Sequence, residues 1–186
     1  IMARAGGRPQ PTITDDCALS SAKIERSLRF NSSDTSVLYR TPSSASNRQT
    51  WTFSTWVKLT DPANGSRQTI FSTNNSNNYS LNGTYLWFQT TGELGLSIGS
   101  GTYYVQTSNK FRDVGSWFHV VAHIDTTQGT ASDRVKLYVN GVQQTFGTTT
   151  YAQNQGYHFF RPGKTHYIGN YNGSEGYFLI SISKKK

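Results

Sequence analysis

The chain has 186 residues and a mass of 20.7 kDa, about the size of one ordinary domain. Apolar residues make up 34% and charged residues 15%, a mixture that excludes coiled coils, acidic disordered tails and proteins inserted in membranes. The net charge is +8, but only +3 belongs to residues 30–183, where the cations are scattered, so specific nucleic-acid binding by the body is not expected.

The amino-terminal residues are rich in Gly, Pro and Arg and show no sustained apolar period. We therefore predict an arm over residues 1–23, with one short helix that starts near Asp16. The body follows as a single domain over residues 24–183, and residues 184–186 form a basic tail. The only cysteine, Cys17, excludes an internal disulfide and a Cys-rich zinc site.

From residue 51 onward, apolar and polar residues alternate, which is the pattern of a strand with one buried face. In the stretch 51–59 the residues predicted to face the core are Trp51, Phe53, Thr55, Val57 and Leu59. In the stretch 117–125 they are Phe118, Val120, Ala122 and Ile124. Between these stretches, residues 95–99 match the Gly-x-Ser-x-Gly nucleophile motif, but no helix is predicted to follow, so a strand is expected there.

The clearest turn of the chain follows Val135, Leu137 and Val139, which alternate with polar residues and lead into Asn140-Gly141. Asn-Gly is the strongest short-range signal for a β-hairpin, so the next strand is expected to begin at Val142. About twelve short strands separated by such turns predict an all-β fold, an antiparallel two-sheet jelly-roll sandwich.

Several motifs resemble the laminin-G-like domains of the concanavalin A-like lectin and glucanase superfamily. The motifs, in chain order, are SLRFNSSDTSVLYRTP at 27–42, RQTWTFSTWVKL at 48–59, WFHVVAHID at 117–125, SDRVKLYVNG at 132–141 and THYIGNY at 165–171. The resemblance covers about residues 27–180 and is greatest for the domains of tailed-phage virion proteins. It implies a concanavalin A-like jelly roll that binds glycans or proteins, because fold membership alone does not fix the ligand.

The superfamily also contains glucanases, in which a retaining mechanism needs two carboxylates about 5 Å apart. The sequence has no pair of acidic residues separated by one position, the spacing that places them side by side on a strand, so we predict no enzyme and no catalytic residues. Carboxylates from different strands would still be able to meet, which leaves a glycan hydrolase as a distant alternative.

No metal or cofactor is predicted from the residue pattern. His119 and His123 share one strand face but would lie about 13 Å apart, too far to bind one ion. The resemblance leaves calcium possible, because related domains bind it with loop aspartates, a role that Asp125 or Asp133 would take here.

A sugar site needs flat aromatic faces flanked by amide, hydroxyl or guanidinium groups. Residues 74–87 and 151–164 combine these groups, and Tyr104 follows a glycine-rich turn. The candidate carbohydrate-binding residues are Tyr79, Tyr85, Trp87, Tyr104, Tyr157, His158 and Arg161. Aromatic residues also fill the cores of jelly rolls, so each one has a structural alternative.

The basic ends suggest a second role, docking onto neighbouring subunits. The candidate anchoring residues are Arg4, Arg8, Lys184, Lys185 and Lys186. The sequence thus predicts a lectin-like module of a virion, extracellular in location, with glycans and other virion subunits as partners and a homo-oligomeric or particle-bound state. The alternative is a structural decoration protein without a ligand.

Overall fold

The computed structural model of the chain describes residues 27–30, 37–59, 67–73, 83–99, 104–147, 151–156, 159–169 and 180–183. The predicted arm and the basic tail lie outside these ranges, so the helix expected near Asp16 does too. Across the described ranges, no helix is long and apolar enough to cross a membrane.

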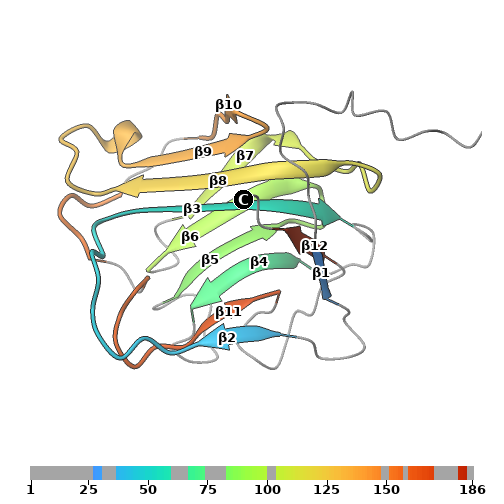
Figure 1. Cartoon of the computed structure of the whole chain (residues 1–186). Coiled ribbons are helices and arrows are strands. Elements are labelled where there is room, and N and C mark those ends of the chain that lie inside the picture. Colours follow the sequence, from blue (N-terminus) through green and yellow to red (C-terminus); the bar gives the residue numbers. More distant parts are fainter. Residues whose placement is uncertain are drawn as a thin grey trace, which may run out of the picture.

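The described strands form two antiparallel sheets of six strands each, packed face to face (Figure 1). The first sheet contains, in spatial order, β1 (Ser27–Phe30), β12 (Ile180–Ser183), β3 (Thr50–Leu59), β8 (Trp117–Asp125), β9 (Val135–Val139) and β10 (Val142–Gln143). The second contains β2 (Leu38–Arg40), β11 (His166–Ile168), β4 (Gln68–Thr73), β5 (Thr84–Phe88), β6 (Glu93–Ile98) and β7 (Tyr104–Lys110). The all-β sandwich predicted from the alternating pattern is confirmed.

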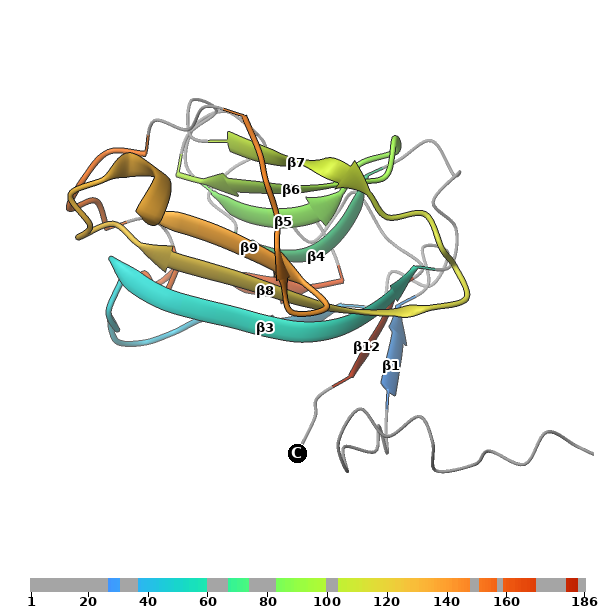
Figure 2. The ribbon, with the colours of Figure 1, turned by 90° about the horizontal axis from the view of Figure 1, so that it is seen from above.

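The core lies between the two sheets, which Figure 2 shows as separate layers. On β3 the predicted inward residues are buried or half-buried, and Thr52 and Ser54 on the opposite face are exposed. β8 shows a strict alternation in which Phe118, Val120, Ala122 and Ile124 are buried. β3 and β8 pair along their whole length, so their inward faces form one apolar surface.

The hairpin between β9 and β10 is confirmed at its predicted position. Asn140 and Gly141 have φ angles of 51° and 79°, the two left-handed conformations that a tight hairpin turn requires. β10 begins at Val142, as predicted. The Gly-x-Ser-x-Gly motif lies in β6 and leads to no described helix, so the strand interpretation of residues 95–98 is also confirmed.

A strap at residues 144–146 joins the two sheets along one edge. The backbone N–H of Gln144 donates to Leu137 of the first sheet, and the N–H of Ser108 in the second sheet donates to Thr145. Phe146 continues the strap through a bridge to Thr107. The sandwich is therefore hydrogen-bonded across its β7/β10 edge.

A buried arginine, Arg134, holds two loops together directly before β9 of the first sheet. η2, a 3-10 turn at Ala131–Asp133, leads into Arg134, whose guanidinium donates to the carbonyls of Gln128, Gly129 and Tyr151. These three acceptors come from two separate segments, so a single side chain holds both loops together. Because the planar guanidinium offers five donors in fixed directions, lysine would not reproduce this arrangement.

Candidate functional site

The outer face of the second sheet carries a row of tyrosine and serine side chains that crosses the strands. The register places Tyr39 opposite Tyr167, Tyr167 opposite Ser72, and Ser72 opposite Tyr85. It continues with Tyr85 opposite Ser97 and Ser97 opposite Tyr104. We call these residues the tyrosine row: Tyr39, Tyr167, Ser72, Tyr85, Ser97 and Tyr104. Aromatic rings and hydroxyl groups thus follow one line across the face.

The two ends of the tyrosine row are accessible and its middle is covered. Tyr39 is 72% exposed on the edge strand β2, and Tyr104 is 36% exposed on the opposite edge strand β7. Tyr85, in the middle of the row, is only 4% exposed. At the Tyr39 end a second ring extends the surface, because the centroid of Tyr167 lies 6.4 Å from that of Tyr39.

The Tyr104 end of the tyrosine row contains a stack centred on Trp87. Trp87 lies on β5 two residues after Tyr85, and therefore on the same face of the sheet. Its indole is stacked with the Tyr104 ring, with centroids 5.5 Å apart and planes 12° from parallel. Gly95, opposite Trp87 on β6, leaves the space that the indole fills, since a Cβ at that position would lie 2.8 Å from it. The guanidinium of Arg67 lies 5.3 Å from the Trp87 ring centroid, within the range of a cation–π contact.

A chain of polar groups surrounds this stack. Arg67 donates to the side-chain oxygen of Gln89 at 3.2 Å, and the Gln89 amide donates to the Tyr104 hydroxyl at 3.0 Å. The hydroxyl in turn donates to Gln106. Partial burial raises the pKa of Tyr104 above its usual value, so the phenol stays protonated and keeps donating at neutral pH. The stack therefore presents both an aromatic face and hydrogen-bonding groups.

The structure brings three of the predicted sugar-binding residues together on this face. Tyr85 and Tyr104 belong to the tyrosine row, and Trp87, which is 6% exposed, supports Tyr104 from below. Arg161 is exposed on the loop before β11 and is not part of the row. Tyr79, Tyr157, His158 and all the predicted anchoring residues lie outside the described ranges.

Sequence reasoning missed Tyr39 and Tyr167, the two rings at the β2 end of the tyrosine row. Both lie on strands of only three residues, where an alternating pattern is too short to recognise. The available signal was the tyrosine at the centre of each strand, but nothing in the sequence shows that these strands pair with each other.

The histidines and aspartates singled out from the sequence are held by other contacts. His119 and His123 form hydrogen bonds with Ser54 and Thr52 on the outer face of the first sheet. Asp125 accepts hydrogen bonds from Thr50, Thr127 and Gln128. These bonds, above all those from the Thr127 and Gln128 side chains, lower the pKa of Asp125 to about 2.

These contacts decide how well calcium would fit. Both carboxylate oxygens of Asp125 already accept hydrogen bonds, and Asp133 is paired with Lys136 at 3.3 Å. The residues with a described position contain no group of three or more His, Cys, Asp or Glu side chains that would hold a metal. The described donors therefore fit calcium poorly; the prediction of no cofactor, with calcium left open by the family resemblance, stays a prediction.

Comparison with known proteins supports the fold. A sequence model described as the concanavalin A-like lectin/glucanases superfamily matches residues 31–184 of the chain. No curated protein sequence matches the chain significantly.

Two solved structures share the architecture. The LG1–3 region of the laminin alpha2 chain is similar with a TM-score of 0.57 and 9% identity, over 86% of this chain and 30% of that one. The CBM40 domain of the Ruminococcus gnavus IT-sialidase, bound to alpha2,3 sialyllactose, is similar with a TM-score of 0.51 and 15% identity, over 73% of this chain and 75% of that one. At these identities the likeness concerns the fold alone.

Proposed function

The chain belongs to the concanavalin A-like lectin/glucanases superfamily, and on this premise we propose that it is a non-enzymatic, lectin-like module that binds glycans through the tyrosine row. The observation that carries the proposal is the register that aligns Tyr39, Tyr167 and Tyr104 on one sheet face. Aromatic faces pack against the apolar side of sugar rings, and the neighbouring hydroxyl and amide groups bind sugar hydroxyls. The CBM40 domain, which binds sialyllactose on the same architecture, supports this choice of ligand class.

The carboxylates support a binding role over a hydrolytic one. Among the described residues, Glu93 is the acidic side chain on the second sheet, and it forms an ion pair with Lys110 at 3.2 Å. The hydroxyl of Thr91 holds the pKa of Glu93 below its usual value. A general acid for glycoside cleavage needs a raised pKa, so Glu93 has the wrong protonation state at neutral pH.

The proposal includes a virion location, with the basic ends as anchors. It is supported by the motif resemblance to phage virion domains and by the cations at positions 4, 8 and 184–186. Deletion of residues 1–23 should release the module from particles and leave glycan binding intact. Unstable particles after the same deletion would instead support a structural decoration protein.

Glycan binding is tested with an array, followed by titration calorimetry on the best ligand. Tyr39→Ala and Tyr104→Ala should each weaken binding about fivefold, because each removes a ring contact of ~1 kcal/mol. Tyr138→Ala is the matched control, since Tyr138 lies in β9 of the other sheet. An array without binding above background, with and without calcium, would overturn the lectin function.

A further inference from the structure

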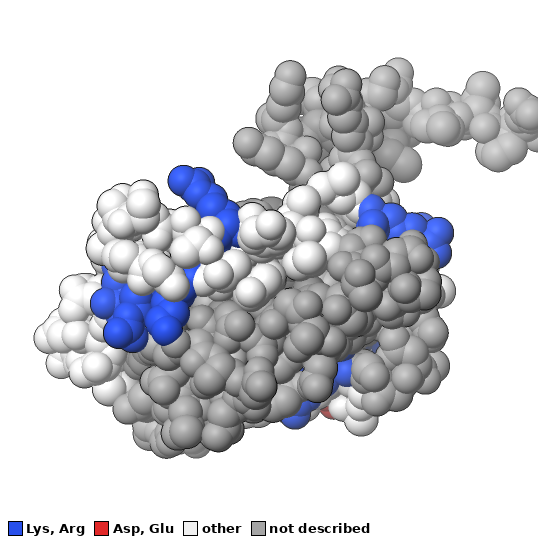
Figure 3. Space-filling model, turned by 90° about the horizontal axis from the view of Figure 1, so that it is seen from below, with Lys and Arg blue, Asp and Glu red and all other residues white. Residues whose placement is uncertain are grey.

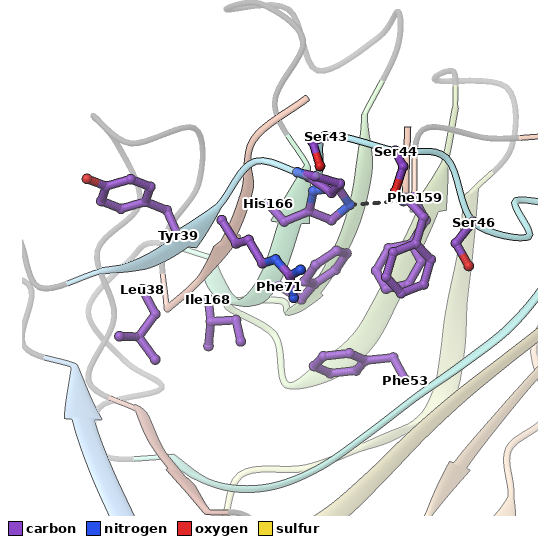
Figure 4. Close-up of a pocket in the computed structure, with 13 residues that line it drawn as sticks. Leu38, Tyr39, Ser43, Ser44, Ser46, Phe53, Phe71, Phe159, His166 and Ile168 are labelled. Atoms are coloured by element: carbon purple, nitrogen blue, oxygen red, sulfur yellow. Dashed lines mark hydrogen bonds between the residues drawn. The ribbon is translucent and has the colours of Figure 1, made fainter. Parts of the chain in front are cut away.

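A cleft of about 440 Å³ opens between the two sheets at the β2/β11 edge, opposite the strap. Its lining comes from β2, the following loop, β3, β4 and the segment that leads into β11. All three residues of β2, Leu38, Tyr39 and Arg40, contribute to the lining of the cleft, and Tyr39 also belongs to the tyrosine row. Figure 4 shows the Tyr39 ring directed away from Leu38 and Ile168, which also line the cleft.

The inner walls of the cleft are aromatic. Phe71 and Phe159 are buried and meet edge to face with centroids 4.8 Å apart. Phe53 reaches in from the first sheet, with its ring centroid 5.2 Å from that of Phe71 (Figure 4). The ring centroid of Phe160 lies 4.2 Å from that of Phe159. Four rings around one volume form a site for a flat or branched apolar group, and the volume lies within the range of small-molecule sites, roughly 300–1,000 Å³.

The rim of the cleft is polar and positively charged. Arg40 and the hydroxyls of Ser43, Ser44 and Ser46 contribute to the lining. None of the four acidic residues with described positions lines the cleft, and none of them forms an ion pair with Arg40. The face of the molecule that carries β2 and β11 shows Lys and Arg side chains and almost no acidic surface among the described residues (Figure 3). A ligand with a negative group would thus meet a cation that no described acidic residue neutralises.

His166 supports the cleft but is not available to a ligand. Its Nε2 accepts the backbone N–H of Phe160 at 3.0 Å, and its Nδ1 lies 3.0 Å from the carbonyl of Lys164. Because a backbone N–H can only donate, the ring is neutral and Nδ1 carries the proton. Both nitrogens are engaged in holding the Phe159–Phe160 corner, where Phe160 has a φ of 55°. Arg40 is therefore the charged group that faces a ligand.

From the four aromatic rings and Arg40, which has no ion-pair partner among the described residues, we propose that this cleft is a second binding site, for a small amphipathic carboxylate. The apolar body of the ligand occupies the space between Phe53, Phe71 and Phe159. Its carboxylate lies at the rim, where Arg40 donates a two-pronged pair of hydrogen bonds and the serine hydroxyls donate to the remaining lone pairs. The site shares Tyr39 with the tyrosine row, but Tyr104 at the other end of the row does not line it.

The test uses the full chain and 3-phenylpropanoate as the probe, with binding followed by titration calorimetry and ligand-detected NMR. Two control ligands separate the contributions: 3-phenylpropan-1-ol keeps the ring without the charge, and propanoate keeps the charge without the ring. The proposal expects 3-phenylpropanoate to bind at least about tenfold more tightly than either control, the equivalent of ~1.4 kcal/mol.

Three variants locate the site. Arg40→Met should weaken 3-phenylpropanoate about tenfold and leave 3-phenylpropan-1-ol unchanged, because a charge-assisted pair is lost. Lys136→Met is the matched control on the other sheet, with the same loss of charge. Ser44→Phe should abolish binding of both ring-bearing probes by filling the cleft, and it replaces an exposed residue, so the fold is kept.

The outcomes separate this proposal from the lectin function. Equal affinity for the acid and the alcohol, equal losses in Arg40→Met and Lys136→Met, or full binding by Ser44→Phe would each overturn it. Tyr104→Ala should weaken the glycan and leave 3-phenylpropanoate unaffected. Loss of both ligands in that variant would mean a single shared site and would also contradict the proposal.

Discussion

Two ionisable side chains hold loops at opposite parts of the sandwich by accepting hydrogen bonds. Asp125 at the end of β8 accepts them from the turn that follows, and His166 in β11 accepts one from Phe160. Each of these bonds requires one protonation state, the ionised carboxylate and the neutral imidazole. The stability of the fold should therefore depend on pH through both residues, over different ranges.

For His166, burial lowers the pKa from 6.5, so the unfolded chain takes up a proton more readily than the folded one. The free energy of unfolding should thus fall as the pH drops through 6.5 and level off below the folded pKa. Urea denaturation at about pH 8 and about pH 5 measures the loss, which should be smaller in His166→Gln than in the wild type. An identical loss in both proteins would refute the assignment of this dependence to His166.

For Asp125 the sign is the same but the range is more acidic, because its pKa is lowered from 3.8 to about 2. Its contribution to stability is fully present above the unfolded pKa and is lost as the pH falls from 3.8 towards 2. Asp125→Asn should be less stable than the wild type at neutral pH, and the difference should vanish in strong acid. Acid titration of both proteins, followed by circular dichroism, measures it. A difference that stays constant down to strong acid would contradict the prediction.

At this scale, sequence reasoning identified Tyr85, Trp87 and Tyr104, which do lie on one face, but not the contacts that they make. The chemical type of a side chain can be read from the sequence, whereas its burial depends on which strands become neighbours. Trp87 is a clear example: its position was a candidate for ligand contact, yet Tyr104 and Arg67 lie over its ring.

At the scale of the strands, position 95 of β6 requires a small residue because Trp87 lies opposite it on β5. The Trp87 indole lies over Gly95, so Gly95→Val should cost about 1–3 kcal/mol by overpacking and should displace the Tyr104 ring. Urea unfolding followed by tryptophan fluorescence measures both effects.

Gly147→Val is the control for that substitution, because nothing lies within 4 Å of a Cβ at Gly147. The same change should therefore have little effect there. Equal destabilisation of the two variants would show a general penalty for losing glycine and would exclude the specific packing of Trp87.

Alternation predicted the long strands β3, β8 and β9 residue by residue, because a half-buried face imposes a period of two over many positions. It does not predict β4 and β5, in which every residue is buried. These strands are covered on both faces, so their sequences do not alternate clearly between apolar and polar. The face that carries the candidate site is thus the one where the pattern is weakest.

For the whole molecule, the strap is the described hydrogen-bonded connection between the sheets at the β7/β10 edge. Gln144 is 5% exposed, and its side chain accepts from Asn109 of β7 and donates to Val142 of β10, both at 2.9 Å. Gln144→Met should lower the free energy of unfolding by about 0.5–1.5 kcal/mol, because the hydrogen bonds of a buried amide are lost. Thermal and urea unfolding measure the change.

The neighbouring Gln143 provides a matched control, since it lies on β10 with an exposed side chain. Gln143→Met should change the free energy of unfolding by less than about 0.5 kcal/mol. If the two variants were equally stable, the strap would not hold the sheets together.

The sandwich as a whole was predictable, but the cleft was not. Its wall requires β2 to pair with β11, residues 38–40 with 166–168, and the corner at Phe159–Phe160 to close over Phe71. Contacts between residues so far apart along the chain leave no local pattern. By contrast, β8, β9 and β10 are consecutive, and their arrangement follows from the Asn140-Gly141 turn.

The pairing of β1 with β12 has a consequence for building larger assemblies. Ser27 lies opposite Ser183, so the start of the first described strand and the end of the last one are neighbouring points of one sheet. A short linker between these positions would join them, and the circularised chain would be able to open at the exposed Asn140-Gly141 turn without breaking a strand. Such a permutant, or an insertion of the domain into a host loop, should keep the sandwich and its two outward surfaces.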